Sequence, residues 1–201
     1  MKLANWFSLP ALAACLFATS LAARAEGQVI EQVKTYAITG KSGIELYTSI
    51  GQQGPKVGNQ LGAIAHTNFK LTWSRKYEPQ GGGCTLVSAR PKLIITYTLP
   101  KPSEDLPAAT AKRWEVFIEG IRRHEAVHGA HIREMVKTIE KTTIGVSVAG
   151  DPGCRKIREE IKTPLSQASL DQRQKSREFD RIEMSDGGNI HRLILQLVNE
   201  R

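Results

Sequence analysis

Aromatic residues are scarce in this sequence, at 6% of the chain, and cysteine is scarcer still, with three residues among 201. No stretch interleaves aromatic and basic residues as a nucleic-acid-binding module does, which argues against nucleic acid as a partner. There is no internal repeat. The apolar run from Trp6 to Leu21 is too short and too rich in alanine for a dependable membrane span, so we expect no stable span.

The apolar run has the layout of a secretory signal peptide. Lys2 supplies a positive start, and Ala23-Arg24-Ala25 has the small residues of a cleavage site. We therefore expect residues 1–25 to be removed after Ala25 and the protein to be periplasmic or secreted. The segment Leu12-Ala13-Ala14-Cys15 also resembles a lipoprotein box, which would leave the protein anchored through Cys15. The apolar residues that follow this box favour cleavage instead.

The remaining 176 residues, Glu26 to Arg201, are enough for a core, and we expect one domain over residues 26–201. Loss of Lys2 and Arg24 lowers the net charge from +8 to +6. That mild excess is compatible with attraction to anionic envelope polymers or nucleic acid. Acidic residues are nevertheless interleaved with basic ones throughout, as in residues 155–160. We interpret the charge as a solvated surface.

Two cysteines remain after cleavage, Cys84 and Cys154. An even pair in an exported chain predicts a disulfide. It would close a loop of about 70 residues and stabilise the domain by at most about 4 kcal/mol on a chain-entropy estimate. Because Cys84 precedes an extended segment and Cys154 follows a long predicted helix, the bond would tie sheet to helix.

The order of predicted elements indicates an α+β, zincin-like fold, with strands first and helices after. The predicted sheet is antiparallel, with strands at residues 29–38, 69–73 and 91–99, separated by glycine-rich turns and loops at 40–43, 51–62 and 80–83. A long metal-binding helix is predicted over residues 110–142. A mostly helical segment follows over 155–179 with a break at Pro164, and the tail from residue 189 fits either a strand or a helix.

The long predicted helix carries the pentapeptide His124-Glu125-Ala126-Val127-His128. Residues i and i+4 share a helix face, so both histidines can bind one metal ion, and Glu125 can polarise a water on that ion. The motif falls within or beside an apolar stripe of period 3.6 that includes Phe117, Ile118, Ile121, Ile132, Met135, Val136 and Ile139. Burying two imidazoles and a carboxylate there is costly unless each has a partner. The pattern therefore favours zinc, with Glu125 as general base, over histidines satisfied by hydrogen bonds alone.

Two other histidines, His131 and His66, fit the role of a zinc ligand less well. On a continuous helix His131 lies roughly 7.5 Å along the axis from a metal held midway between His124 and His128. We interpret His131 as a flanking residue and His66, ahead of a predicted strand, as structural.

With these residues considered, the mature chain resembles the bacterial predicted secreted zinc-dependent proteases, a domain-of-unknown-function family numbered nine-two-two. The resemblance covers most of the mature chain and depends first on the His-Glu-x-x-His helix. It also includes Trp114, the strand at residues 67–73, Cys84, the strand ending at Leu99-Pro100, and Phe179-Asp180. It implies one zinc ion per chain and peptide-bond hydrolysis.

The resemblance also suggests a third zinc ligand. The late family motif is similar to Tyr-Asp-x-x-Thr-x-His-Gly, and this chain has Asp186-Gly187 in place of His-Gly, with one inserted residue. A carboxylate can replace imidazole on zinc. Asp186 is therefore the first choice for this ligand, with Glu183 and His191 as alternatives.

Three functions remain open from the sequence. The favoured one is an exported zinc metallopeptidase that acts on a peptide or protein substrate. The second is a catalytically inactive metal-binding envelope protein that binds a partner. The third is a basic structural or anion-binding module in which the histidine motif is incidental.

Overall fold

A computed structural model describes residues 27–56 and 62–199. The expected signal peptide, the lipoprotein box at Cys15 and part of the loop at 51–62 lie outside these residues. The elements, in chain order, are β1 (Gln28–Ile38), α1 (Gly43–Gln53), β2 (His66–Gln80), β3 (Gly83–Pro102), α2 (Ala108–Thr143), β4 (Ser147–Val148), α3 (Lys156–Glu160), α4 (Lys162–Met184) and α5 (Asn189–Val198). The predicted α+β class is confirmed.

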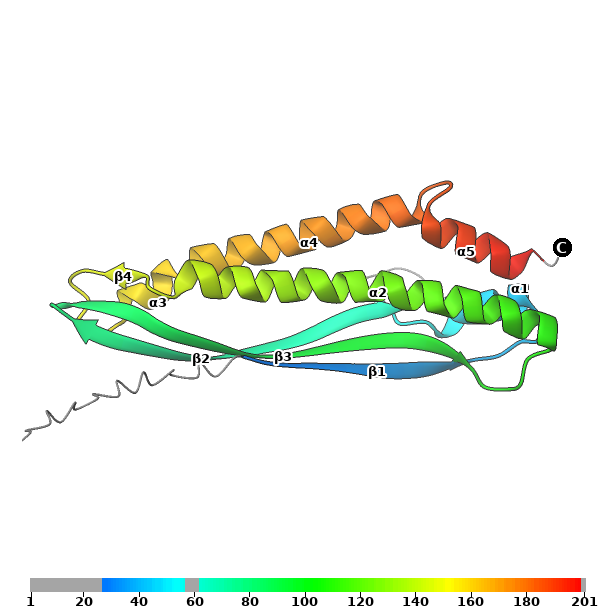
Figure 1. Ribbon diagram of the computed structural model, residues 1–201, viewed down its shortest axis with the longest axis horizontal. Helices are drawn as coiled ribbons and strands as arrows, with labels where there is room; N and C mark the ends of the chain where they lie inside the picture. The colour runs from blue at the N-terminus through cyan, green and yellow to red at the C-terminus, as the bar shows by residue number, and fades with distance from the viewer. Residues whose placement is uncertain (1–26, 57–61, 200–201) are drawn as a thin grey trace, which may run out of the picture.

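The elements form three layers (Figure 1), with the sheet on one side, α2 in the middle, and α4 and α5 on the other side. Strand β3 buries Leu93, Ile95, Tyr97 and Leu99 at every second position, as a strand with one covered face must. Helix α2 is covered by the sheet and by the outer helices, which explains why it buries residues along its whole length.

The sheet is mixed rather than wholly antiparallel. Its order is β1-β3-β2, with β4 added to β3. Strands β2 and β3 form an antiparallel hairpin, whose turn uses Gly81 and Gly82 at φ of 56° and 77°. Strand β1 instead pairs with β3 in parallel, from Gln28 opposite Lys92 to Ile38 opposite Pro102. Parallel pairing is possible because the chain passes through α1 and β2 before it reaches β3.

Three further predictions on local structure are corrected or decided by the fold. Helix α1 was not predicted: it fills residues 44–50, to which no element was assigned, and extends into the loop expected at 51–62, and Ser42 and Glu45 form a capping box at its start. The helical break falls at Ile161 rather than at Pro164, because proline is tolerated in the first turn of α4, where its missing N–H costs no bond. The C-terminal tail is helical, as α5.

Helix α2 comes unusually close to β3 beside the histidine motif. A Cβ built on Gly129 would lie 2.1 Å from the hydroxyl oxygen of Tyr97. A larger side chain fits there only if the Tyr97 side chain moves, so the absence of a Cβ at Gly129 lets Tyr97 pack against α2 next to His128.

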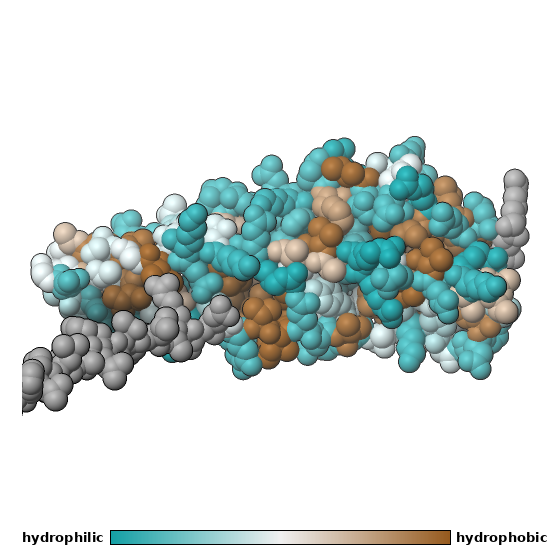
Figure 2. Space-filling view, in the orientation of Figure 1, coloured by the Kyte–Doolittle hydropathy of each residue, from teal (hydrophilic) through white to brown (hydrophobic). Residues whose placement is uncertain are grey.

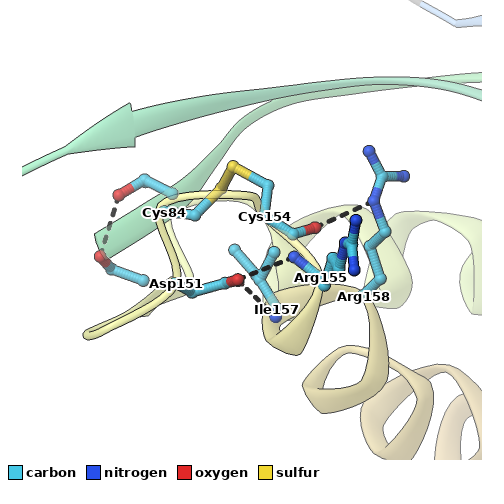
Figure 3. Close-up of a disulfide and its surroundings, with 8 residues drawn as sticks. Cys84, Asp151, Cys154, Arg155, Ile157 and Arg158 are labelled. Carbon is cyan, nitrogen blue, oxygen red and sulfur yellow. Dashed lines mark hydrogen bonds between the residues drawn. A yellow bond between two sulfur atoms is a disulfide. The ribbon is translucent and has the colours of Figure 1, made fainter. Parts of the chain in front are cut away.

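The predicted disulfide between Cys84 and Cys154 is confirmed (Figure 3), and it joins the start of β3 to the loop before α3. The loop is held further by Asp151, whose carboxylate accepts hydrogen bonds from the backbone N–H groups of Arg155 (2.8 Å) and Ile157 (3.0 Å). A disulfide fits a secreted or periplasmic protein. Separately, no helix among the described residues is long and apolar enough to cross a membrane.

Protein taken from the periplasm is expected to carry this disulfide in full, because both sulfur atoms are buried in the cluster that contains Leu86 and Ile157. Thiol labelling under native and denaturing conditions, before and after reduction, measures it. Labelling should occur only after reduction, with two thiols per chain. Two thiols that label in the denatured, unreduced protein would contradict the assignment.

Candidate metal site

Three side chains that suit a metal ion meet between α2 and α4. His124 and His128 come from one face of α2, and Asp180 comes from the last turns of α4. The Nε2 atoms of the two histidines are 3.1 Å apart, and Asp180 Oδ1 lies 3.1 Å from His124 Nε2 and 2.9 Å from His128 Nε2. Among the described residues, no other group of three His, Cys, Asp or Glu side chains comes together in this way.

The spacing of these atoms is close to that around zinc. Zinc bonds imidazole nitrogen and carboxylate oxygen at about 2.0–2.2 Å, so two ligand atoms at a tetrahedral angle lie about 3.3–3.6 Å apart. The three observed separations are within about half an ångström of that range. Asp180 is the most exposed of the three side chains, at 42%, so solvent reaches the site from the α4 side.

Hydrogen bonds alone do not satisfy this group. A single imidazole nitrogen either donates or accepts, but not both, and a carboxylate oxygen only accepts. If both Nε2 atoms carry hydrogen, two donors face each other at 3.1 Å; if one lacks it, its lone pair faces the carboxylate oxygen. A cation among the three atoms removes the conflict, so the residues fit a metal ion.

Outer contacts orient His124. Its Nδ1 atom is buried and has no hydrogen bond within 3.5 Å among the described atoms, yet it lies 3.7 Å from Glu183 Oε2. Asn189 holds the same carboxylate with a 3.0 Å hydrogen bond from its side-chain amide. Histidines that bind metals usually donate their second ring nitrogen to such a carboxylate. Glu183 lies behind His124 where such a partner would be, at a separation longer than a hydrogen bond.

Phe179 forms an apolar wall beside the group. Its ring stacks on His124 with centroids 4.7 Å apart and meets His128 edge-on at 5.5 Å. His131 lies further out, where its Nδ1 atom is 3.2 Å from Ser176 Oγ. His131 is thus outside the three-residue group.

Glu125 points from α2 toward the sheet. Its side chain is buried, and Oε2 accepts a 2.5 Å hydrogen bond from the hydroxyl of Thr67 on β2, which also lies 3.2 Å from the Glu125 carbonyl oxygen. The charge of Glu125 acts on His128. The carboxylate is therefore held next to the candidate ligands by a strand, without being one of them.

Asp180 and His128 each stabilise the charged form of the other. Burial by itself would raise the pKa of Asp180, but hydrogen bonds and charge from His124 and His128 hold it well below its usual range. Burial lowers the pKa of His128, yet the hydrogen bond and charge of Asp180, with the charge of Glu125, raise it overall. Asp180 is thus ionised at neutral pH, and a metal must displace a proton that His128 holds more firmly than a free imidazole does.

The structure brings His124 and His128 together as the sequence predicts, but it does not bring Asp186 to them. Asp186 is exposed in the turn between α4 and α5, and His191 is engaged there because its Nδ1 accepts the Gly187 N–H at 3.0 Å. Asp180 takes the expected place of Asp186, and Glu183 lies behind His124. The aromatic-Asp pair at 179–180, shared with the family motif, was the available signal for Asp180.

The fold and the site together define an α+β protein with a candidate two-histidine, one-carboxylate metal centre between two helices. The chain belongs to the family described as "Bacterial protein of unknown function (DUF922)", which matches residues 33–188 and so includes all three candidate ligands. No curated protein and no solved structure matches the chain.

Proposed function

We propose that this protein is an exported, zinc-dependent metallopeptidase whose metal is held by His124, His128 and Asp180. The observation that carries the proposal is the convergence of three ligand atoms, 2.9–3.1 Å apart, beside a buried carboxylate that is not one of them. A catalytic zinc commonly has three protein ligands and one open position. The family is described as being of unknown function, so the proposal depends on the geometry of the site.

The roles of the residues follow from their positions. A zinc ion bound there would supply a Lewis acid for the scissile carbonyl and favour ionisation of water. Glu125 accepts the proton from the attacking water and returns it to the leaving amine as a general base and then acid. Thr67 positions Glu125 through its hydroxyl, and Glu183 positions His124.

The test combines metal analysis with a cleavage assay on the same samples. Protein exported without a histidine tag should contain about one zinc per chain and should cleave members of a mixed peptide library. Chelation should remove both properties, and added zinc should restore them. Bound zinc without cleavage of any library member would favour the catalytically inactive metal-binding protein, and absence of zinc would leave the basic structural module.

Glu183→Gln is expected to weaken zinc binding by about 10–100-fold while it leaves the fold intact, because the carboxylate orients His124 from behind. Competition with a chelator of known affinity measures the change. Glu178→Gln is the matched control, since Glu178 lies on the same helix and pairs with Arg181 at the surface. Equal zinc affinity in Glu183→Gln and the control would contradict the positioning role.

A further inference from the structure

A groove of about 780 Å³ runs between α2 and the sheet, apart from the metal site. Its walls are the start of β1, residues 87–91 and 93 of β3, and the last turns of α2 with Ile144 just after them. None of the residues assigned to the metal site lines this groove. The proposed peptidase activity therefore gives it no role.

One wall of the groove is a length of β3 with an open edge. Strand β1 begins opposite Lys92, while β4 pairs only with Cys84 and Thr85, and Leu86 bonds to the backbone at Gly145 and Val146. Between these contacts, residues 88–90 pair with β2 on one side only, within the described part of the chain, and Val87 lies at a β-bulge without a partner on β2. Figure 1 shows the resulting arrangement, in which β1 accompanies only the part of β3 nearer α1. The four residues 87–90 span about 13 Å, enough for a short added strand.

The groove also gathers exposed apolar side chains. Val29, Val87 and Ile144 are 48%, 38% and 40% exposed, and all three line it, above a buried floor that includes Leu93 and Val136. Figure 2 shows hydrophobic and hydrophilic side chains interspersed over the face of the molecule that it draws. Exposed apolar residues that cluster along an open strand edge are typical of a peptide-binding site.

The charge at the rim indicates what kind of peptide fits. Arg90, Arg133, Lys137 and Lys141 line the groove together with one carboxylate, Glu140. Arg133 pairs with Glu31 of β1, whereas Arg90, Lys137 and Lys141 form no ion pair with any residue between 27 and 199 that the structure places. Apart from the Arg133–Glu31 pair, the groove therefore presents three positive side chains and one carboxylate around an apolar floor, a positive excess that favours an acidic ligand.

We propose that this groove binds an extended, acidic segment of a partner protein, which joins the open edge of β3 as a short strand. Backbone hydrogen bonds to residues 87–90 supply the alignment, since an added strand satisfies the groups that the edge leaves unpaired. Alternate side chains of the segment face the apolar floor. Its acidic side chains meet Arg90, Lys137 and Lys141.

The probe for this proposal is a fluorescein-labelled peptide of alternating valine and glutamate, titrated with the exported protein and followed by fluorescence anisotropy. We expect saturable binding that weakens with salt. A peptide with lysine in place of glutamate should not bind, nor should one with alternate backbone nitrogens methylated. On binding, those amides of residues 87–90 that do not bond to β2 should become protected from hydrogen exchange.

The matched protein variants separate charge at the groove from charge in general. Lys137→Glu with Lys141→Glu should weaken binding by about tenfold or more, whereas Lys101→Glu with Lys112→Glu makes the same change in net charge elsewhere and should leave it unaltered. All four positions are exposed, so the fold should tolerate both pairs.

Several outcomes would overturn the proposal. One is the absence of saturable binding up to about 1 mM peptide, and another is equal binding of the methylated or lysine peptide. Protection, in the free protein, of those amides of residues 87–90 that do not bond to β2 would show that the chain's own N-terminal segment or a second copy fills the groove. Sedimentation of the free protein tells these two occupants apart.

Discussion

Replacement of His124 by alanine is expected to abolish zinc binding. His124 Nε2 takes part in two of the three short separations that define the site, and its loss leaves one histidine and one carboxylate. The affinity should fall by more than the roughly 10–100-fold that accompanies loss of an outer carboxylate partner. Zinc per chain, measured after dialysis against metal-free buffer, is the readout, and circular dichroism checks that the variant is folded.

Asp180, in the last turns of α4, and Asp186, just after α4, provide a matched pair of variants for the same assay. Asp180→Ala should lose zinc as His124→Ala does, because Asp180 Oδ1 lies within 3.1 Å of both histidine nitrogens. Asp186→Ala should retain it, because Asp186 is exposed in the turn beyond α4. Full zinc in His124→Ala would contradict the site. Loss of zinc in Asp186→Ala but not in Asp180→Ala would contradict the assignment of its third ligand.

Glu125→Gln should keep zinc but lower turnover by a factor of about 10² or more, the usual scale for a general base. Glutamine has nearly the same shape, and its amide oxygen can still accept the hydrogen bond from Thr67, so the buried packing is preserved. What changes is the ability to take a proton. The measurement is cleavage of the mixed peptide library, with zinc content determined on the same samples.

Thr67→Val is the control that distinguishes loss of the Glu125 base from loss of its positioning. Thr67→Val removes the hydroxyl that holds Glu125 but leaves the carboxylate, so its loss of turnover should be smaller than that of Glu125→Gln. Equal cleavage by the wild type and Glu125→Gln would eliminate Glu125 as the base. If neither cleaves and both hold zinc, the inactive metal-binding alternative is favoured.

The part of the site that lies on one helix could be predicted from the sequence. The spacing of His124 and His128 depends only on the local geometry of α2, and the apolar stripe around them showed that this face is buried. The bond between Cys84 and Cys154 was equally accessible, since export and an even count leave one pairing. The α+β class followed from the order of strand and helix patterns.

What could not be predicted depends on how distant elements meet. Asp180 reaches the histidines because α4 packs back along α2, which no local period determines. Asp186 has the right chemistry but lies beyond the end of α4. The parallel pairing of β1 likewise depends on which edge of β3 it joins, and the same alternating pattern suits either direction. Helix α1 was missed although its capping box, Ser42 with Glu45, is visible in the sequence.

The most direct test is X-ray diffraction from crystals of the untagged, exported protein at two wavelengths on either side of the zinc absorption edge. We predict one anomalous peak per chain that vanishes below the edge, at about 2.0–2.2 Å from His124 Nε2, His128 Nε2 and an Asp180 carboxylate oxygen. Crystals grown with zinc that show no such peak, and in which these three side chains contact only one another, would contradict the metal site on which the proposed peptidase depends.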